Sequence, residues 1–126
     1  MKLIIGGSHQ GKKAYASTAY HLPSEAWADG QTCSLEAVFT MPAIHNFHLY
    51  LRRCLADGEN LSALPGEIMM KNPHVVIVTD EVGYGIVPME REERIWREAC
   101  GRVCTALAAE AEQVVRVCCG IGQKLK

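Results

Sequence analysis

A glycine-rich loop near the start of the chain most limits what this sequence can fold into. The loop spans residues 6–13 and has the spacing G-x-x-x-x-G-K. Residues 2–5, just before it, form an apolar run that predicts a buried strand, and residues 11–21 lack proline and predict a helix. Backbone N–H groups of such a loop can surround phosphate oxygens, and the helix start adds a favourable dipole. The segment therefore predicts a phosphate-binding strand–loop–helix unit, with a plain glycine turn before a basic helix start as the alternative.

The rest of the chain alternates between strand and helix patterns. Strands are predicted at residues 33–39, 74–79 and 114–119, and helices at 43–55 and 89–112. Residues 25–32 are interpreted as a polar turn, and residues 60–71 are a loop or a short helix. Alternating strands and helices favour a parallel sheet with helices on its faces. With 126 residues, the chain fits one α/β domain, residues 1–126, of the P-loop NTPase-like type with a mainly parallel sheet.

The charge balance and the length of the apolar runs exclude some classes of partner. Thirteen Lys and Arg side chains stand against fourteen Asp and Glu, which gives a net charge of -1. This argues against a strongly basic nucleic-acid-binding protein. The longest apolar stretches, such as residues 75–78, are far shorter than the roughly 20 residues of a membrane span. We therefore expect no nucleic-acid partner, no membrane partner and a cytoplasmic location.

The glycine-rich loop supplies the candidate nucleotide-binding residues. In this motif the lysine reaches the β- and γ-phosphates, and the next residue is a Ser or Thr whose hydroxyl binds Mg²⁺. Here Lys12 has the first role, but Lys13 stands at the hydroxyl position, so Mg²⁺ binding is possible but weakened. The predicted nucleotide-binding residues are Gly6, Gly7, Ser8, His9, Gln10, Gly11, Lys12 and Lys13.

Three acidic residues are candidates for catalysis beside Lys12. Asp80 and Glu81 follow the predicted strand 74–79, and ligands of open α/β sheets bind at the carboxyl ends of strands. Glu36 falls within the predicted strand 33–39, where it could orient Mg²⁺ through water. The alternatives are a polar strand end that leads into a turn for Asp80 and Glu81, and a partly exposed edge-strand side chain for Glu36.

Histidines and cysteines give weaker signals. His45 and His48 share one face of the predicted helix 43–55 and are either surface side chains or a metal-binding or nucleophilic pair. The six cysteines contain no C-x-x-C pair, which favours buried reduced thiols over a metal site. Cys118 and Cys119 are neighbours in a predicted strand, so their side chains should point to opposite faces. We assign no residue as a metal ligand.

Two of these motifs together resemble a known family. Residues 3–13 resemble the opening strand and phosphate loop of the bifunctional adenosylcobinamide kinase and adenosylcobinamide-phosphate guanylyltransferase of cobalamin biosynthesis. Residues 76–88, with the sequence VIVTDEVGYGIVP, are similar to a longer and more specific hallmark of that family. Residues 99–103 and 119–126 are also similar to family segments. The resemblance covers the first twenty residues and roughly residues 35–126.

The resemblance implies a substrate, a pair of reactions and an assembly. The family uses GTP or ATP to phosphorylate adenosylcobinamide and then transfers GMP to that phosphate. The resemblance also implies that the chain forms a homo-oligomer. This chain departs from the family at Lys13, where a Ser or Thr is usual, and at Asp80, where an Asn is usual. The family segment with the guanylylated histidine is reduced here to residues 22–32, which contain no histidine. The alternative is a non-catalytic nucleotide-binding relative that has lost that histidine and the loop hydroxyl.

Overall fold

A central six-stranded sheet organises the chain in the computed structural model, which describes residues 1–82 and 90–126. The strand order is β2-β3-β4-β1-β5-β6, and the pairs are parallel except β5 with β6. This confirms the predicted α/β class with a mainly parallel sheet. The strands are β1 (Lys2–Gly6), β2 (Trp27–Asp29), β3 (Ala43–His45), β4 (Val76–Asp80), β5 (Gln113–Cys118) and β6 (Ile121–Lys124).

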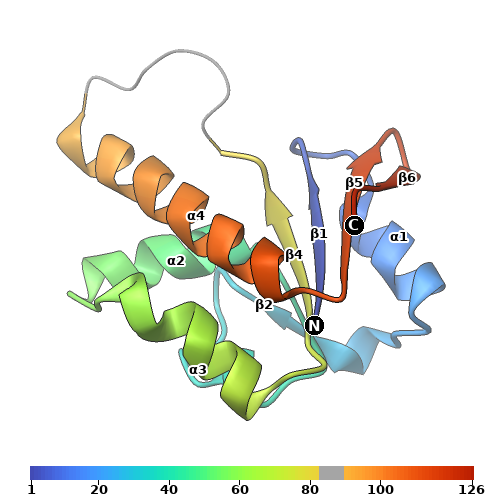
Figure 1. Cartoon of the computed structure of the whole chain (residues 1–126), viewed down its shortest axis with the longest axis horizontal. Coiled ribbons are helices and arrows are strands. Elements are labelled where there is room, and N and C mark those ends of the chain that lie inside the picture. Colours follow the sequence, from blue (N-terminus) through green and yellow to red (C-terminus); the bar gives the residue numbers. More distant parts are fainter. Residues whose placement is uncertain (83–89) are drawn as a thin grey trace.

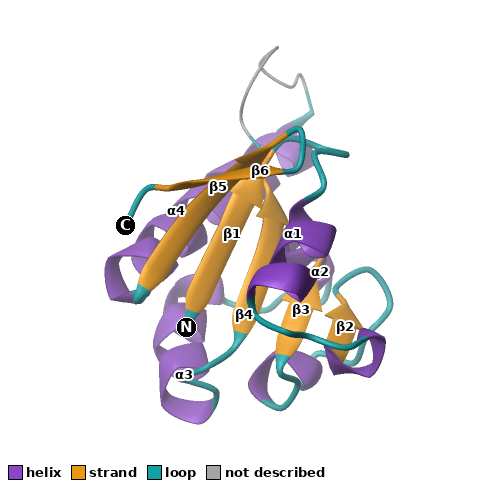
Figure 2. Ribbon diagram, turned by 90° about the vertical axis from the view of Figure 1, so that its right-hand side faces the viewer, coloured by secondary structure: helices purple, strands orange, loops and turns teal. Residues whose placement is uncertain are grey.

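Helices cover both faces of this sheet, as Figures 1 and 2 show. Helix α1 lies on one face, and α2, α3 and α4 lie on the other. The helices are α1 (Lys12–Ala19), α2 (Phe47–Ala56), α3 (Leu64–Lys71) and α4 (Arg91–Glu110). Three short 3₁₀ turns stand at Ser24–Ala26, Ala37–Phe39 and Leu61–Ala63.

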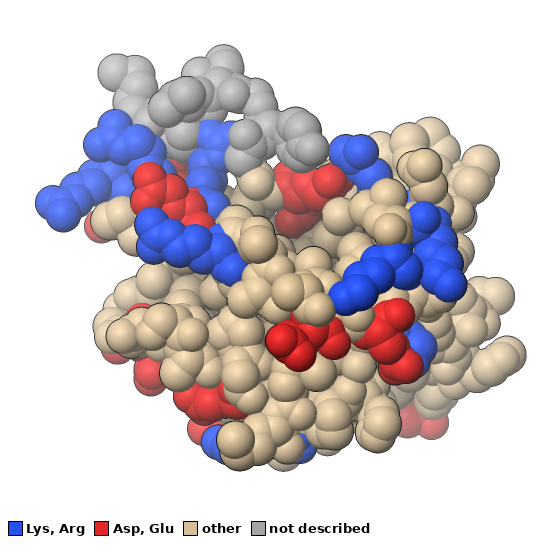
Figure 3. Space-filling view, in the orientation of Figure 1, with Lys and Arg blue, Asp and Glu red and all other residues tan. Residues whose placement is uncertain are grey.

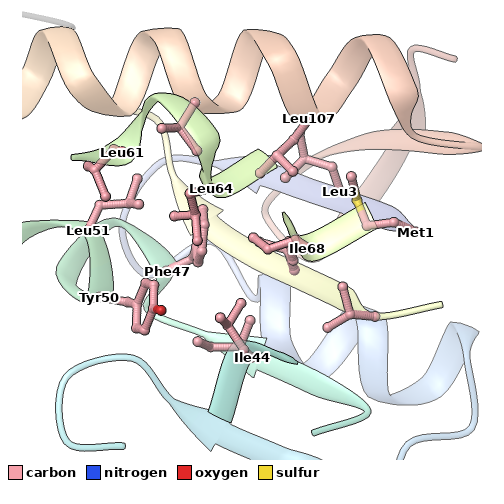
Figure 4. Close-up of a cluster of buried hydrophobic side chains, with 14 of the residues drawn as sticks. Met1, Leu3, Ile44, Phe47, Tyr50, Leu51, Leu61, Leu64, Ile68 and Leu107 are labelled. Atoms are coloured by element: carbon pink, nitrogen blue, oxygen red, sulfur yellow. The ribbon is translucent and has the colours of Figure 1, made fainter. Parts of the chain in front are cut away.

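The core has a large side and a small side, one on each face of the sheet. On the three-helix side, Phe47 and Leu51 from α2 and Ile68 from α3 pack with Leu107 from α4, and none of the four is exposed (Figure 4). On the α1 side, Ile4, Ala16 and Val115 belong to a smaller cluster. The central strands β1 and β4 are therefore buried from both faces, which explains their continuous apolar runs.

The predicted strand 33–39 is wrong. Its residues form a loop that ends in the 3₁₀ turn Ala37–Phe39, and Glu36 is an exposed residue just before that turn. The structure places strands instead at β2, within the predicted polar turn 25–32, and at β3. Apolar and polar residues alternate only weakly over 33–39, so the support for a strand there was slight. Strands β2 and β3 have three residues each, which is too short for a two-residue alternation to be recognised.

The helix predicted at 43–55 begins later than expected. Residues Ala43–His45 are strand β3, and helix α2 starts at Phe47. Asn46 makes the break, because it adopts a left-handed backbone with φ 54°, a conformation that asparagine tolerates. His45 and His48 consequently lie in different elements and do not share a helix face.

The carboxyl-terminal half follows the predictions more closely. Helix α4 confirms the long amphipathic helix, with Cys100, Val103 and Leu107 buried. Strand β5 confirms the strand predicted at 114–119, except that it ends at Cys118. The antiparallel strand β6 was not predicted. Residues 83–89 of the hallmark segment, and the predicted helix start at Met89, lie outside the described residues.

Charges of both signs are interspersed over the face in Figure 3, in line with the net charge of -1. Across residues 1–82 and 90–126, no helix is long and apolar enough to cross a membrane.

Candidate functional site

The glycine-rich loop joins β1 to α1 at the carboxyl edge of the sheet, as the sequence predicts. Gly6 must be a glycine, because a Cβ there would lie 2.4 Å from the carbonyl oxygen of Val117 on β5. Gly11 has φ 84° and stands directly before α1. Its position also faces the backbone of Gly120, 3.3 Å from where a Cβ would lie. The glycines thus let the loop pass close to the β5–β6 turn.

Lys12 is the buried cation of the loop. Its side chain is 7% exposed, and its Nζ donates to the carbonyl oxygen of Gly7 over 2.6 Å. The same Nζ lies 2.7 Å from Oδ1 of Asp80, at the end of β4. A buried ammonium is stable only where such partners replace water. The structure therefore brings together two predicted site residues, Lys12 and Asp80.

His48 is the third member of this cluster. Its Nε2 lies 3.4 Å from Oδ2 of Asp80, and its Nδ1 accepts a hydrogen bond from the Asp80 backbone N–H over 3.2 Å. Nδ1 therefore carries no proton, and Nε2–H faces the carboxylate. Burial lowers the pKa of His48; Asp80 opposes this effect and Lys12 adds to it. His48 is thus a neutral imidazole that orients the Asp80 carboxylate.

A cavity of about 240 Å³ opens beside the loop. His45 and Asn46, from the end of β3, line it together with Lys12, Lys13 and Asp80. Burial, and next the charge of Lys13, lower the pKa of His45, while Asp29 raises it. The sequence interpretation did not place His45 here, because it put this residue on a helix. The rule that ligands meet the carboxyl ends of parallel strands would have found it, had β3 been recognised.

Lys13 extends toward strand β2. Its Nζ lies 5.7 Å from the centre of the Trp27 ring, and the edge of that ring meets His45. Asp29 at the end of β2 accepts a hydrogen bond from Asn46 over 3.1 Å. An ammonium cannot bind Mg²⁺, so the residue at the hydroxyl position does not fit a loop-bound magnesium ion.

The other two acidic candidates differ in their positions. Glu81 lies at the start of the loop, because its backbone N–H donates to the Gly6 carbonyl oxygen over 2.9 Å, and its Oε2 is 3.2 Å from Nε of Arg116 on β5. Glu36 lines a separate cavity of about 140 Å³ with Tyr50, Cys54 and Glu67. The structure therefore does not bring Glu36 to the glycine-rich loop, because the strand expected to carry it there does not form.

The turn between β5 and β6 fixes the tip of the loop. The backbone N–H of Cys119 donates to the side-chain oxygen of Gln10 over 2.7 Å. The N–H of Gly120 donates to the backbone oxygen of Gln10 over 2.8 Å. No pattern in the sequence indicated this contact, because β6 was not predicted.

Comparison with known proteins adds the family. Residues 47–125, well over half of the chain, match the family described as cobinamide kinase / cobinamide phosphate guanyltransferase. The bifunctional adenosylcobalamin biosynthesis protein CobU of Salmonella typhimurium is 54% identical over 52 residues, 41% of this chain and 29% of that protein. The protein of the same name from Escherichia coli gives the same values. The chain thus matches less than a third of the length of either curated relative.

The family match starts at Phe47, so it contains His48, Asp80 and Glu81 but not the glycine-rich loop. In the folded chain the glycine-rich loop nevertheless lies at the same site, because it contacts Asp80 and the β5–β6 turn. On this match, the chain belongs to the cobinamide kinase / cobinamide phosphate guanyltransferase family.

Proposed function

We propose that the chain binds GTP or ATP at the glycine-rich loop and acts on adenosylcobinamide in cobalamin biosynthesis, with the kinase step as its activity. The observation that carries this proposal is the buried Lys12 ammonium at the loop, beside a cavity at the carboxyl edge of the sheet. Family membership supports the kinase class and the cobinamide substrate.

Lys12 would change partners when the triphosphate binds. In the free protein its ammonium contacts the Gly7 carbonyl and the Asp80 carboxylate. Phosphate oxygens would take the place of Asp80, since they carry more negative charge and are the partners that this lysine position serves. The ammonium would then stabilise the charge that develops on the transferred phosphoryl group.

Asp80 would gain a role from the same exchange. Once Lys12 turns to phosphate, the Asp80 carboxylate keeps Nε2–H of His48 as its partner. A side-chain oxygen held this way could accept a hydrogen bond from the attacking hydroxyl of adenosylcobinamide and position it, a role that the Asn usual in the family could also serve. Glu81 follows Asp80 and would help to position substrate, with Arg116 as its present partner.

Magnesium would contribute less here than in other loops of this type. The hydroxyl ligand is replaced by Lys13, whose charge offsets part of the phosphate charge without a metal. We therefore propose nucleotide binding with a weak Mg²⁺ requirement. The expected cytoplasmic location and homo-oligomeric state remain predictions.

Calorimetric titration with GTP and with ATP, each with and without Mg²⁺, tests the proposal. We expect binding of at least one nucleotide in the wild type. We expect Lys12→Ala to lose about 2–4 kcal/mol of binding free energy, typical for truncation of a buried charged contact. Lys71→Ala on α3 is the matched control, because it removes an ammonium that is half exposed and remote from the loop.

Turnover is tested separately, with adenosylcobinamide and the nucleotide that binds. Formation of adenosylcobinamide phosphate supports the kinase step. Binding without any turnover would establish the non-catalytic alternative instead. If no nucleotide binds, or if Lys12→Ala binds as tightly as the wild type, the site assignment fails.

A further inference from the structure

Two neighbouring thiols stand at the turn that holds the glycine-rich loop. Cys118 ends β5 and Cys119 starts the β5–β6 turn, and both side chains are exposed. The prediction that both lie in one strand was wrong, because β5 ends at Cys118. The strand ends between them, so the strand alternation does not apply to the pair.

The backbone at Cys119 is unusual for this residue type. Cys119 has φ 51° and Gly120 has φ 75°, between the paired residues Cys118 and Ile121. A two-residue turn with both φ values positive favours Asn-Gly or Gly-Gly, and a cysteine at its first position is strained. Strain held at one position is a reason to look for function there.

The same turn is tied to the predicted nucleotide site. The N–H groups of Cys119 and Gly120 hold the side chain and the backbone of Gln10, at the tip of the glycine-rich loop. A group added to either thiol would therefore disturb the hydrogen bonds from Cys119 and Gly120 to Gln10, which hold the predicted phosphate-binding loop.

The other pair of nearby cysteines differs in burial and in the pKa of its thiols. Cys100 and Cys104 lie one turn apart on α4, and burial raises the pKa of Cys100 to about 12 and that of Cys104 to about 11. Thiols in that state react slowly, because the thiolate is the nucleophile. The exposed pair is therefore the part of the chain suited to thiol exchange, among the residues that the structure describes.

We propose that Cys118 and Cys119 form a site of reversible thiol modification by low-molecular-weight disulfides, and that the modified protein binds nucleotide more weakly. The second half rests on the proposed nucleotide binding. The expected loss has two causes: the adduct displaces the turn from Gln10, and a charged adduct such as glutathione brings carboxylates next to the phosphate site.

The chemistry is one exchange step. The thiolate of Cys118 attacks one sulfur of the disulfide, and the S–S bond of that reagent breaks. A new S–S bond joins Cys118 to one half of the reagent, and the other half leaves as a thiolate that takes up the proton lost by Cys118. We assign the attack to Cys118, which is exposed at the end of β5, since the neighbouring Cys118 thiol raises the pKa of Cys119 and so disfavours the Cys119 thiolate.

Intact-mass spectrometry of the reduced, folded protein after incubation with oxidised glutathione tests the site. We expect one glutathione adduct, which peptide mapping places on Cys118 and which dithiothreitol removes. Cys118→Ser should abolish the adduct, whereas Cys119→Ser should keep it on Cys118. Cys104→Ser is the control and should react like the wild type. An adduct that maps to any other cysteine, or no adduct at all, overturns the proposed site.

Titration with GTP of the modified and the reduced protein tests the coupling. We expect about tenfold weaker binding after modification, within the usual range for coupling between two sites, and full recovery with dithiothreitol. Equal affinities would overturn the coupling. If the reduced protein itself binds no nucleotide, the proposed function fails, while the mass measurement still decides whether the thiol site exists.

Discussion

At the scale of single residues, Asp80 has the most informative environment. Its carboxylate holds Lys12 at 2.7 Å and faces Nε2 of His48 at 3.4 Å. Under the proposed nucleotide binding, Asp80 would therefore compete with phosphate for the lysine. We expect Asp80→Asn to bind GTP about tenfold more tightly, because one negative charge next to the phosphates is removed.

The measurement is calorimetric titration with GTP, and Asp57→Asn is the matched control. Asp57 is an exposed residue at the end of α2, so this change alters the net charge equally but leaves the site intact. Weaker binding in Asp80→Asn would show that Asp80 assists binding and does not compete with it. Kinase turnover should persist in the same variant, because Asn is the residue usual at this position in the family that the sequence resembles.

Lys13 gives a second prediction at this scale. Lys13→Thr restores the hydroxyl that binds Mg²⁺ in loops of this type, so nucleotide binding should become more dependent on Mg²⁺. Titrations with and without Mg²⁺ measure this directly. Lys13→Ala is the control, because it removes the same ammonium without adding a hydroxyl. A wild type that already requires Mg²⁺ strongly would mean that other residues hold the metal.

How far the sequence predicts the site depends on the residue. Lys12 and Asp80 could be placed, because each lies next to a strongly patterned strand and parallel strands end at a common edge. His45 could not be placed. Ile44, Phe47 and Leu51 have helical spacing, so the residues of the short strand β3 were assigned to the following helix. Glu36 was misplaced for a related reason, because a weakly alternating loop was taken for a strand.

At the scale of elements, the junction of β2 and β3 depends on close backbone contact. A Cβ on Gly30 would lie 2.3 Å from the carbonyl oxygen of Asn46, a backbone atom that cannot easily move. We expect Gly30→Ala to lower the free energy of unfolding by about 1–3 kcal/mol, typical of overpacking. Urea unfolding followed by circular dichroism would measure the change.

Gly101→Ala is the contrasting variant. Gly101 lies in the interior of α4, and no atom stands within 4 Å of the added Cβ. Alanine there should raise the free energy of unfolding by about 0.5–1 kcal/mol, because it is the better helix former. If Gly30→Ala leaves the free energy of unfolding unchanged or raises it, the close contact with Asn46 does not constrain this junction.

Elements with long, continuous patterns could be predicted from the sequence, and short ones could not. Strands β1, β4 and β5 are runs of apolar residues, and α4 carries an apolar stripe along its length. Strands β2 and β3 have three residues each, and β6 is mostly exposed. Such short segments are held by their neighbours in the sheet and not by their own pattern.

At the scale of the whole molecule, the histidines at the site make stability depend on pH. The folded protein lowers the pKa of His45 and His48 below 6.5. As the pH falls through about 6.5, the unfolded chain therefore takes up these protons before the folded protein does. The free energy of unfolding should decrease between pH 7 and pH 5.

Urea unfolding at several pH values measures this decrease. His48→Asn, which keeps an acceptor for the Asp80 N–H, should show a smaller decrease between pH 7 and pH 5 than the wild type. His74→Asn is a suitable control, because His74 is exposed beside β4, away from the site. An equal decrease in the wild type and in His48→Asn would remove His48 as a cause.

The strand order also determines how late in synthesis the fold can be completed. Strand β1 pairs with β4 on one side and with β5 on the other. Lys2 can therefore complete its pairing only after both Val76 and Gln113 have been synthesised. Contacts between residues so distant in the chain close slowly, and the exposed β1 meanwhile offers two unpaired edges. The support of Gln10 forms later still, because Cys119 and Gly120 follow Gln113 along the chain. A nascent chain that stops before these residues would lack both the turn and the support that it gives to the glycine-rich loop.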